Sequence, residues 1–287
     1  MVAALEATGN YRVLRRLQPR ICGPDFIEDP RLALFVDVET TGLDAGRDEI
    51  IELAMVPFWY GRDGEILGCS EPFQAFNQPR RPITPEIQAL TGITNEMVAD
   101  QRIDLAAVLS IVSPSALVVA HNAAFDRRFL ERLDAVFTTK AWACSMSQVD
   151  WAADGHEGTK LGYLAQACGF FYDRHRAVND CFAAIELLAR PLRRAGRPAM
   201  TELLDRARAP SWRIWAENSP FDLKDQLKAR GYRWNGEAGP SPRAWYVDVE
   251  EAALQDELRF LSTEIYQREV DLLTRRIDAY DRFSDRC

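Results

Sequence analysis

Two carboxylates lie two residues apart at the end of an apolar run, at Asp37 and Glu39. In a strand, side chains at i and i+2 leave the same face, so both carboxylates would point the same way. Like charges held this close repel one another unless a cation lies between them. A solvated strand end is the alternative, and the pair alone does not choose between the two.

Two further aspartates and a histidine add to this pair. Asp126 is expected in the first turn of a helix, where the helix dipole alone would favour an acid. Asp180 begins an inward-facing apolar helical stripe, and a buried carboxylate needs a partner or a metal. His175 has the side chain whose ordinary pKa suits proton transfer near neutral pH. Each residue alone also fits a structural or surface role, so only the whole set indicates chemistry.

Alternating strands and helices are expected to position these residues. The apolar run 32–38 predicts a central strand, and strands 50–59 and 66–76, joined by GlyArgAspGly, would complete an antiparallel meander. Short strands are expected at 117–120 and 141–144. Helices are expected after Asn122, at 161–168 and at 180–192. The pattern predicts an α/β fold, a mixed sheet with helices on its faces.

Three motifs occur in a fixed order with these acids. They are PheValAspValGluThrThrGly at 35–42, HisAsnAlaAlaPheAspArgArgPhe at 121–129 and HisArgAlaValAsnAsp at 175–180. Together with GluIleGlnAlaLeuThrGlyIleThr at 86–94, they make residues 31–193 resemble the DEDDh family of 3′→5′ exonucleases. That family includes the proofreading subunit of DNA polymerase III and ribonuclease T. Arg176 stands where the rival subclass has a tyrosine, so the histidine subclass is favoured.

The resemblance implies a ribonuclease-H-like fold and two divalent metal ions. It implies Mg²⁺ as the physiological ion and Mn²⁺ as a substitute, since both favour oxygen ligands. The metal-binding acids would be Asp37, Glu39, Asp126 and Asp180. His175 would be the general base that activates the attacking water.

Residues around the motifs are candidates for substrate contact. Thr40, Thr41 and Gly42 follow Glu39, where the family places the terminal nucleotide. His121 and Asn122 are further candidates, although His121 equally fits structural support and Asn122 equally fits a helix cap.

Composition excludes several classes of protein. The chain has 287 residues, is 47% hydrophobic and carries a net charge of −8, which argues against disorder and against a surface that coats nucleic acid. No apolar run approaches the roughly 18 residues of a membrane span, and the first residues predict no secretory signal. Six cysteines lack any CxxC pair, so neither zinc nor a disulfide framework is expected. We therefore expect a cytoplasmic protein without membrane contact.

Three segments are expected along the chain: an N-terminal arm at 1–30, the exonuclease domain at 31–197 and a small α+β module at 198–287. Four of the seven tryptophans lie between 212 and 245. The module is predicted to hold a helix at 223–231, strands at 232–235 and 243–249 around the turn at 236–240, and helices at 250–261 and 269–280.

The role of the module stays open. Its tryptophans could form a small core. Alternatively, it could bind nucleic acid, with Trp234 or Trp245 stacking on bases and five basic side chains contacting phosphates: Lys224, Lys228, Arg230, Arg233 and Arg243. The core is the preferred interpretation.

The sequence therefore predicts a hydrolase, a metal-dependent 3′→5′ exonuclease that releases nucleoside 5′-monophosphates from single-stranded 3′ ends, with DNA favoured and a role in DNA repair. The alternatives are an exoribonuclease that trims RNA, or a non-catalytic adaptor with a protein partner in replication or repair.

Overall fold

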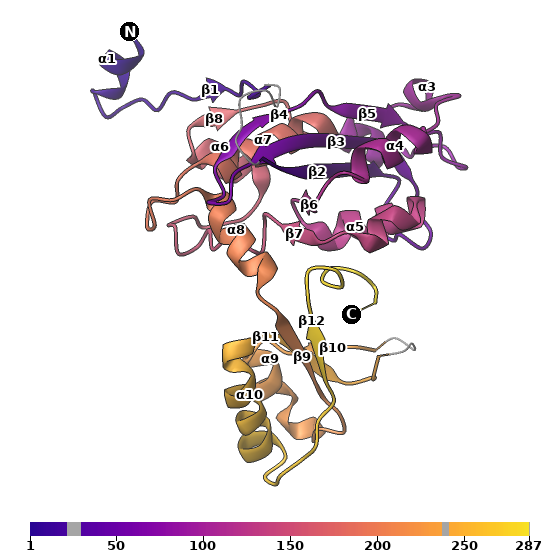
Figure 1. Cartoon of the computed structure of the whole chain (residues 1–287), viewed down its shortest axis with the longest axis vertical. Coiled ribbons are helices and arrows are strands. Elements are labelled where there is room, and N and C mark those ends of the chain that lie inside the picture. Colours follow the sequence, from indigo (N-terminus) through magenta and orange to yellow (C-terminus); the bar gives the residue numbers. More distant parts are fainter. Residues whose placement is uncertain (22–29, 237–240, 287) are drawn as a thin grey trace. The chain divides into compact units, whose positions relative to one another are not determined.

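The computed structural model describes residues 1–21, 30–236 and 241–286. The chain divides into two compact units, Met1–Leu204 and Asp205–Cys287 (Figure 1). Helix α8 (Ala199–Arg208) runs along the chain across this division. The expected boundary at 197/198 lies just before that helix, and the assignment of domains stays a prediction.

A six-stranded mixed sheet forms the centre of the first unit. Its strand order is β4-β3-β2-β6-β7, with β5 also pairing with β3. The strands are β2 (Arg31–Thr40), β3 (Ile50–Tyr60), β4 (Ile66–Cys69), β5 (Phe73–Phe76), β6 (Leu117–Ala120) and β7 (Trp142–Cys144). β3 runs antiparallel to β2, β4 and β5, whereas β6 is parallel to β2 and β7 is parallel to β6. The expected mixed sheet and α/β class are therefore confirmed.

The third expected strand, 66–76, is divided in two. Both pieces pair with β3, but Pro72 lies between them, and a proline has no N–H to donate to a strand ladder. The GlyArgAspGly turn is present, since Gly61 N donates to Glu65 O at 2.9 Å and Gly64 N to Gly61 O at 3.1 Å.

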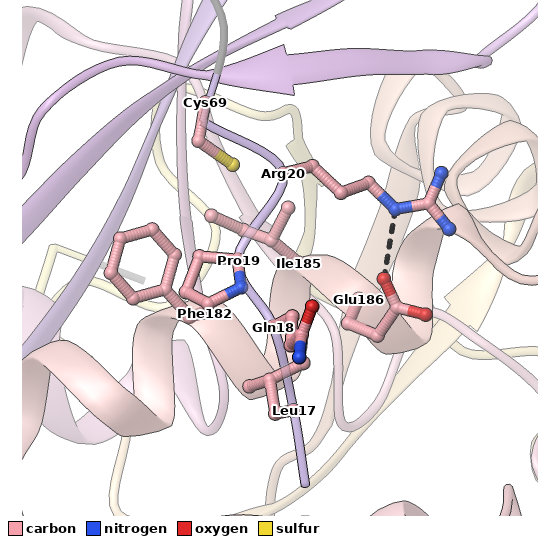
Figure 2. Close-up of a pocket in the computed structure, with 8 residues that line it drawn as sticks. All are labelled: Leu17, Gln18, Pro19, Arg20, Cys69, Phe182, Ile185 and Glu186. Atoms are coloured by element: carbon pink, nitrogen blue, oxygen red, sulfur yellow. Dashed lines mark hydrogen bonds and ion pairs between the residues drawn. The ribbon is translucent and has the colours of Figure 1, made fainter. Parts of the chain in front are cut away.

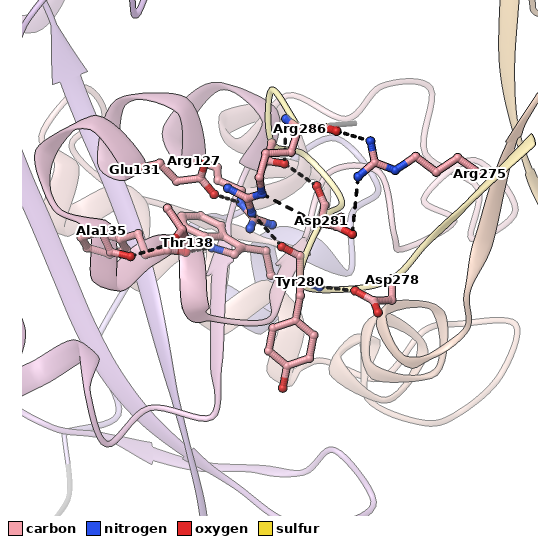
Figure 3. Close-up of polar contacts among 12 residues, drawn as sticks. Arg127, Glu131, Ala135, Thr138, Arg275, Asp278, Tyr280, Asp281 and Arg286 are labelled. Carbon is pink, nitrogen blue, oxygen red and sulfur yellow. Dashed lines mark hydrogen bonds and ion pairs between the residues drawn. The ribbon is translucent and has the colours of Figure 1, made fainter. Parts of the chain in front are cut away.

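Helices lie between and after these strands along the chain. They are α2 (Pro85–Thr91), α3 (Asn95–Val98), α4 (Leu105–Val112), α5 (Ala123–Leu133), α6 (Leu161–Ala167) and α7 (Ala177–Ala189). Helix α7 contacts β2 and β3, and α5 contacts β2, β6 and β7. The helix expected at 180–192 begins three residues earlier, so Asp180 lies in its first turn rather than at its start. Within α5, Arg127 is fully buried and pairs with Glu131 at 2.7 Å (Figure 3).

The chain before the sheet lies along the first unit. It holds helix α1 (Val2–Glu6) and strand β1 (Arg15–Arg16), which pairs in parallel with β8 (Phe170–Phe171). Arg20 Nε lies 2.9 Å from Glu186 Oε2 on α7. Figure 2 shows residues 17–20 beside α7, around a cavity of about 10 Å³ that Cys69, Phe182 and Ile185 also line. That volume is about the size of one water.

The second unit has the expected α+β composition. Its four-stranded sheet has the order β10-β11-β9-β12, with β9 (Ser211–Ala216), β10 (Arg233–Trp234), β11 (Trp245–Glu250) and β12 (Thr274–Ile277). Its helical segments are η3 (Phe221–Leu223), α9 (Lys224–Ala229), η4 (Glu251–Ala253), α10 (Leu254–Phe260) and the π-helix η5 (Leu261–Ile265). Of the expected turn at 236–240, residues 237–240 lie outside the described residues.

The helix expected at 269–280 is wrong. Residues Thr274–Ile277 form β12, which pairs antiparallel with β9 and buries Ile277. Pairing with a central strand satisfies the backbone and overrides the weak helical preference of the segment. After β12, Asp278 Oδ1 accepts from Tyr280 N at 2.8 Å, and Arg275 donates to the Arg286 carbonyl (Figure 3).

The tryptophans are only partly the core of this unit. The buried cluster consists of Ile214, Ala216, Leu227, Tyr232, Leu261 and Ile265, with Trp245 packed against it. Trp234, in contrast, is 54% exposed. Among the described residues, no helix is both long and apolar enough to cross a membrane.

Candidate active site

Strand β2 positions the first two acids. Asp37 lies opposite Ala54 of β3, and Glu39 lies opposite Glu52, before a register shift at Thr40. Their neighbours Val36 and Val38 are buried, while Asp37 and Glu39 are half-buried. The alternation of the strand therefore turns both carboxylates to one face, as the sequence predicts.

Asp180 joins this pair from the first turn of α7. Carboxylate oxygens of Asp37, Glu39 and Asp180 all lie within 4.8 Å of one another. Because α7 packs on β2 and β3, residues more than 140 positions apart in the chain share one site.

Asp126 approaches the same strand from α5. It is only 2% exposed, and its Oδ1 accepts a hydrogen bond from Val38 N at 3.1 Å. The residue that donates this hydrogen bond, Val38, lies between Asp37 and Glu39. Asp126 thus lies beside the group of three, hydrogen-bonded to the strand that carries Asp37 and Glu39.

The pKa values of all four acids are raised, because ionising these carboxyl groups is unfavourable in the folded protein. Burial, and then repulsion by Asp126 and the other acids, raises the pKa of Asp37 well above its usual range. Burial and repulsion by Asp180 and Glu52 raise the pKa of Glu39 to about 7. Burial raises the pKa of Asp126 to about 8 and also raises the pKa of Asp180. The set therefore resists ionisation in the absence of a cation.

His175 lies in the loop directly before α7. Its side chain is exposed, its backbone is left-handed with φ of +62°, and its N donates to Asp180 Oδ2 at 3.0 Å. A positive φ is uncommon outside glycine and often accompanies a functional constraint. The fold thus brings His175 to the edge of the acidic cluster.

Two residues near the cluster were not predicted from the sequence as part of the site. Tyr172 donates from its hydroxyl to Asp180 Oδ1 at 2.7 Å, and Glu52 is a fully buried carboxylate on β3. Tyr172 lies in a loop without periodicity, so nothing in its spacing marked it. Glu52 stands in an apolar run, and an acid at a central strand position was the signal that could have found it.

The turn after Glu39 is tightly bonded within itself. Thr40 Oγ1 donates to Gly42 O at 2.6 Å, and Thr41 Oγ1 donates to Asp48 Oδ1 at 3.2 Å. Gly42 allows a close approach, because a Cβ there would lie 2.5 Å from Asp48 Oδ2. The neighbour that comes close to Gly42 in this structure is thus a side chain of the turn itself.

Both ring nitrogens of His121 are engaged. Nδ1 lies 2.9 Å from Ser145 Oγ and Nε2 lies 2.7 Å from the Thr159 carbonyl, and burial lowers the pKa of His121 to about 4. A carbonyl accepts only, so Nε2 carries the proton and Nδ1 accepts from the serine. This geometry favours the support role for His121.

Asn122 precedes α5 with φ of +86° and is exposed, and in this part of the described chain its side chain makes no capping bond. Phe125 packs against Phe129, with ring centroids 5.0 Å apart, as expected of a core residue. His156 lies in a loop and is buried, beside Asp154.

The first unit is similar to known proteins. Residues 34–188, just over half of the chain, match the exonuclease family model (RNase_T). DNA polymerase III PolC-type of Bacillus subtilis (strain 168) is 42% identical over 106 residues, which are 36% of this chain and 7% of that protein. The same enzyme of Listeria monocytogenes serovar 1/2a is 42% identical over 170 residues, 56% of this chain and 11% of that protein. The chain therefore spans only a small part of these relatives.

A solved structure shares the fold. Escherichia coli Exonuclease I in complex with a 5cy-dT13 oligonucleotide superposes with a TM-score of 0.50 and 16% identity, over 77% of this chain and 63% of that one.

The fold is that of the ribonuclease-H-like class, and the first unit carries an acidic cluster with a histidine at its edge. The chain belongs to the exonuclease family, of the DEDDh type.

Proposed function

We propose that Asp37, Glu39, Asp126 and Asp180 hold two divalent metal ions. The observation that carries this proposal is the convergence of three carboxylates within 4.8 Å on a half-buried surface. Their oxygens are the ligands that Mg²⁺ and Mn²⁺ prefer, and four carboxylates offset the formal charge of two such ions. The repulsion that adds to burial in raising the pKa values of Asp37 and Glu39 would be relieved by cations, so the residues fit the group.

The reaction is hydrolysis of the terminal phosphodiester. Bound divalent ions supply a more acidic water and stabilise the charge on the leaving oxygen. His175, exposed at the rim of the cluster, takes the proton of the attacking water. Tyr172 and the His175 amide both donate to Asp180, which orients that carboxylate.

The proposed substrate is the 3′ end of single-stranded nucleic acid, with DNA favoured over RNA and nucleoside 5′-monophosphates as products. Support comes from relatives that are DNA polymerases and from the oligonucleotide bound to Exonuclease I. Thr40, Thr41, Gly42 and Asn122 are the proposed contacts to the terminal nucleotide, and His121 supports the loop beside them. A function in DNA proofreading or repair is part of this proposal.

A degradation assay tests the proposal. Single-stranded DNA and RNA of matched sequence, labelled at the 5′ end, are offered to the purified chain with Mg²⁺, Mn²⁺ or EDTA. We expect a metal-dependent ladder of shortened DNA, lost in Asp37→Ala and strongly reduced in His175→Ala.

Three outcomes would contradict parts of it. A ladder that persists in EDTA overturns metal dependence. Faster shortening of RNA makes the chain an exoribonuclease. No shortening by either wild type or Asp37→Ala favours the non-catalytic adaptor.

A further inference from the structure

Glu52 is a buried carboxylate for which the proposed chemistry has no use. It lies on β3 opposite Glu39 and is 0% exposed. Burying a carboxylate is costly unless hydrogen-bond donors surround it, and an unpaired one would also repel Glu39. Its position next to the acidic cluster therefore requires a reason.

Three donors converge on this carboxylate. Arg176 Nη2 lies 3.2 Å from Oε1, Ala177 N lies 3.3 Å from Oε2, and the Gln74 side-chain amide donates to Oε1. Every partner donates, which matches a carboxylate that only accepts. Ala177 is the first residue of α7, and its amide is one of those that a helix leaves without an internal partner.

Two of these donors directly follow His175 in the chain. The His175 loop is thus held at two points: its own amide bonds to Asp180, and the next two residues bond to Glu52. The Arg176 guanidinium also lies over the Phe76 ring, with Cζ 5.5 Å from the centroid. Because His175 has an uncommon positive φ, its backbone depends on such anchors.

We propose that Glu52 is a positioning residue for His175, acting through Arg176 and Ala177. This inference rests on the proposed role of His175 as the base. Glu52 holds the backbone on the C-terminal side of His175 against β3, so that the imidazole faces the acidic cluster. The rival interpretation is a structural carboxylate that stabilises the fold and has no effect on catalysis.

Glu52→Gln tests this while preserving size. A glutamine keeps one acceptor and turns the other oxygen into an NH₂ group that would face a donor, either Arg176 or Ala177. With saturating Mg²⁺ and single-stranded DNA, we expect kcat to fall about tenfold with KM unchanged, as is typical of lost supporting partners. Glu202→Gln is the matched control. Glu202 is also buried and accepts from a backbone amide, Asp150 N at 3.0 Å, and from Arg194. It should lower Tm and leave kcat unchanged.

A double-mutant cycle with His175→Ala isolates the coupling. If Glu52 acts through His175, Glu52→Gln costs about tenfold in the wild-type background and almost nothing when His175 is absent. An equal loss in both backgrounds, or a wild-type kcat in folded Glu52→Gln, overturns the inference. If Glu52→Gln does not fold, Arg176→Met enters the same cycle with the same expectation, and additivity there overturns it.

The two proposals fail in different ways. If His175→Ala alone leaves kcat unchanged, the role of His175 as the base is wrong. If His175→Ala lowers kcat and Glu52→Gln does not, only the positioning role of Glu52 is wrong.

Discussion

At the scale of residues, the acidic cluster is a site in which charges oppose folding. Asp37, Glu39 and Asp180 lie within 4.8 Å, and Asp126 lies beside them with almost no exposure. Burial raises all four pKa values, and repulsion by neighbouring acids adds to the rise at Asp37, Glu39 and Asp126. Such an arrangement lowers the stability of the metal-free protein and favours the binding of cations.

The loss of stability caused by ionising Glu39 can be measured as a function of pH. Its pKa rises from 4.5 to about 7 in the folded protein, so its contribution to stability is full below about pH 4.5 and is lost as pH rises through 7. Glu39→Gln removes this loss. In EDTA, we expect the variant to gain on wild type by about 2.5 kcal/mol between pH 5 and pH 8. Urea unfolding at several pH values measures the difference.

The control for this prediction is Glu71→Gln, which replaces an exposed glutamate of the same unit. It should unfold like wild type at every pH. A constant difference between Glu39→Gln and wild type from pH 5 to pH 8 would contradict the prediction.

At the scale of elements, strand β2 and the turn after it have different roles: the strand orients the acids, and the turn lies beside them. The alternation of β2 aims two carboxylates to one side, and the turn 40–48 follows at once. Asp48 braces this turn, because its carboxylate accepts from Asp44 N at 2.9 Å and from Thr41 Oγ1 at 3.2 Å. Gly42 lets that carboxylate lie against the backbone.

Gly42→Ala should therefore disturb the turn. The added methyl would lie 2.5 Å from Asp48 Oδ2, so the carboxylate must move. We expect a loss of about 1–3 kcal/mol in stability and a fall in kcat, since the displaced turn adjoins Glu39. Chemical unfolding and the DNA ladder assay measure the two effects. In an Asp48→Ala background the same change should cost much less, and an equal cost would show that the clash is elsewhere.

At the scale of the whole molecule, the chain has two compact units, and the second has a hydrophobic core of its own. The core of the second unit is a cluster whose members all lie between 214 and 265. Within it, the buried Tyr232 hydroxyl donates to Glu257 Oε1 at 2.8 Å, and Arg230 Nε lies 2.9 Å from the same carboxylate. This unit therefore has its own core and its own buried polar network.

Leu227→Ala tests that core. Leu227 is 0% exposed, and truncating a buried leucine costs about 2–5 kcal/mol because a cavity remains. Tryptophan fluorescence follows the unfolding of this unit, since four of the seven tryptophans lie in it. Leu273→Ala removes a leucine that is 47% exposed and should cost far less. Similar losses in the two variants would mean that Leu227 does not belong to the core.

Much of the first unit could be predicted from the sequence. The strands near 32–38, 50–59 and 117–120 and helices α5, α6 and α7 appear within a few residues of their expected places. Their signals are periodic apolar runs and turn residues, which act locally. The second unit was predicted less well, because β9 was missed and β12 was taken for a helix.

The sequence by itself determined the order of the motifs, the fact that Asp37 and Glu39 point to the same side of their strand, and the residue types of the site, since these depend on neighbours in the chain. Only the tertiary structure decided which distant residues complete it. Glu52 holds the residues after His175, which lie 124 and 125 positions further along the chain, because α7 packs on β2 and β3. Contacts between positions more than 100 residues apart leave no periodic trace in a single sequence, so packing alone reveals them.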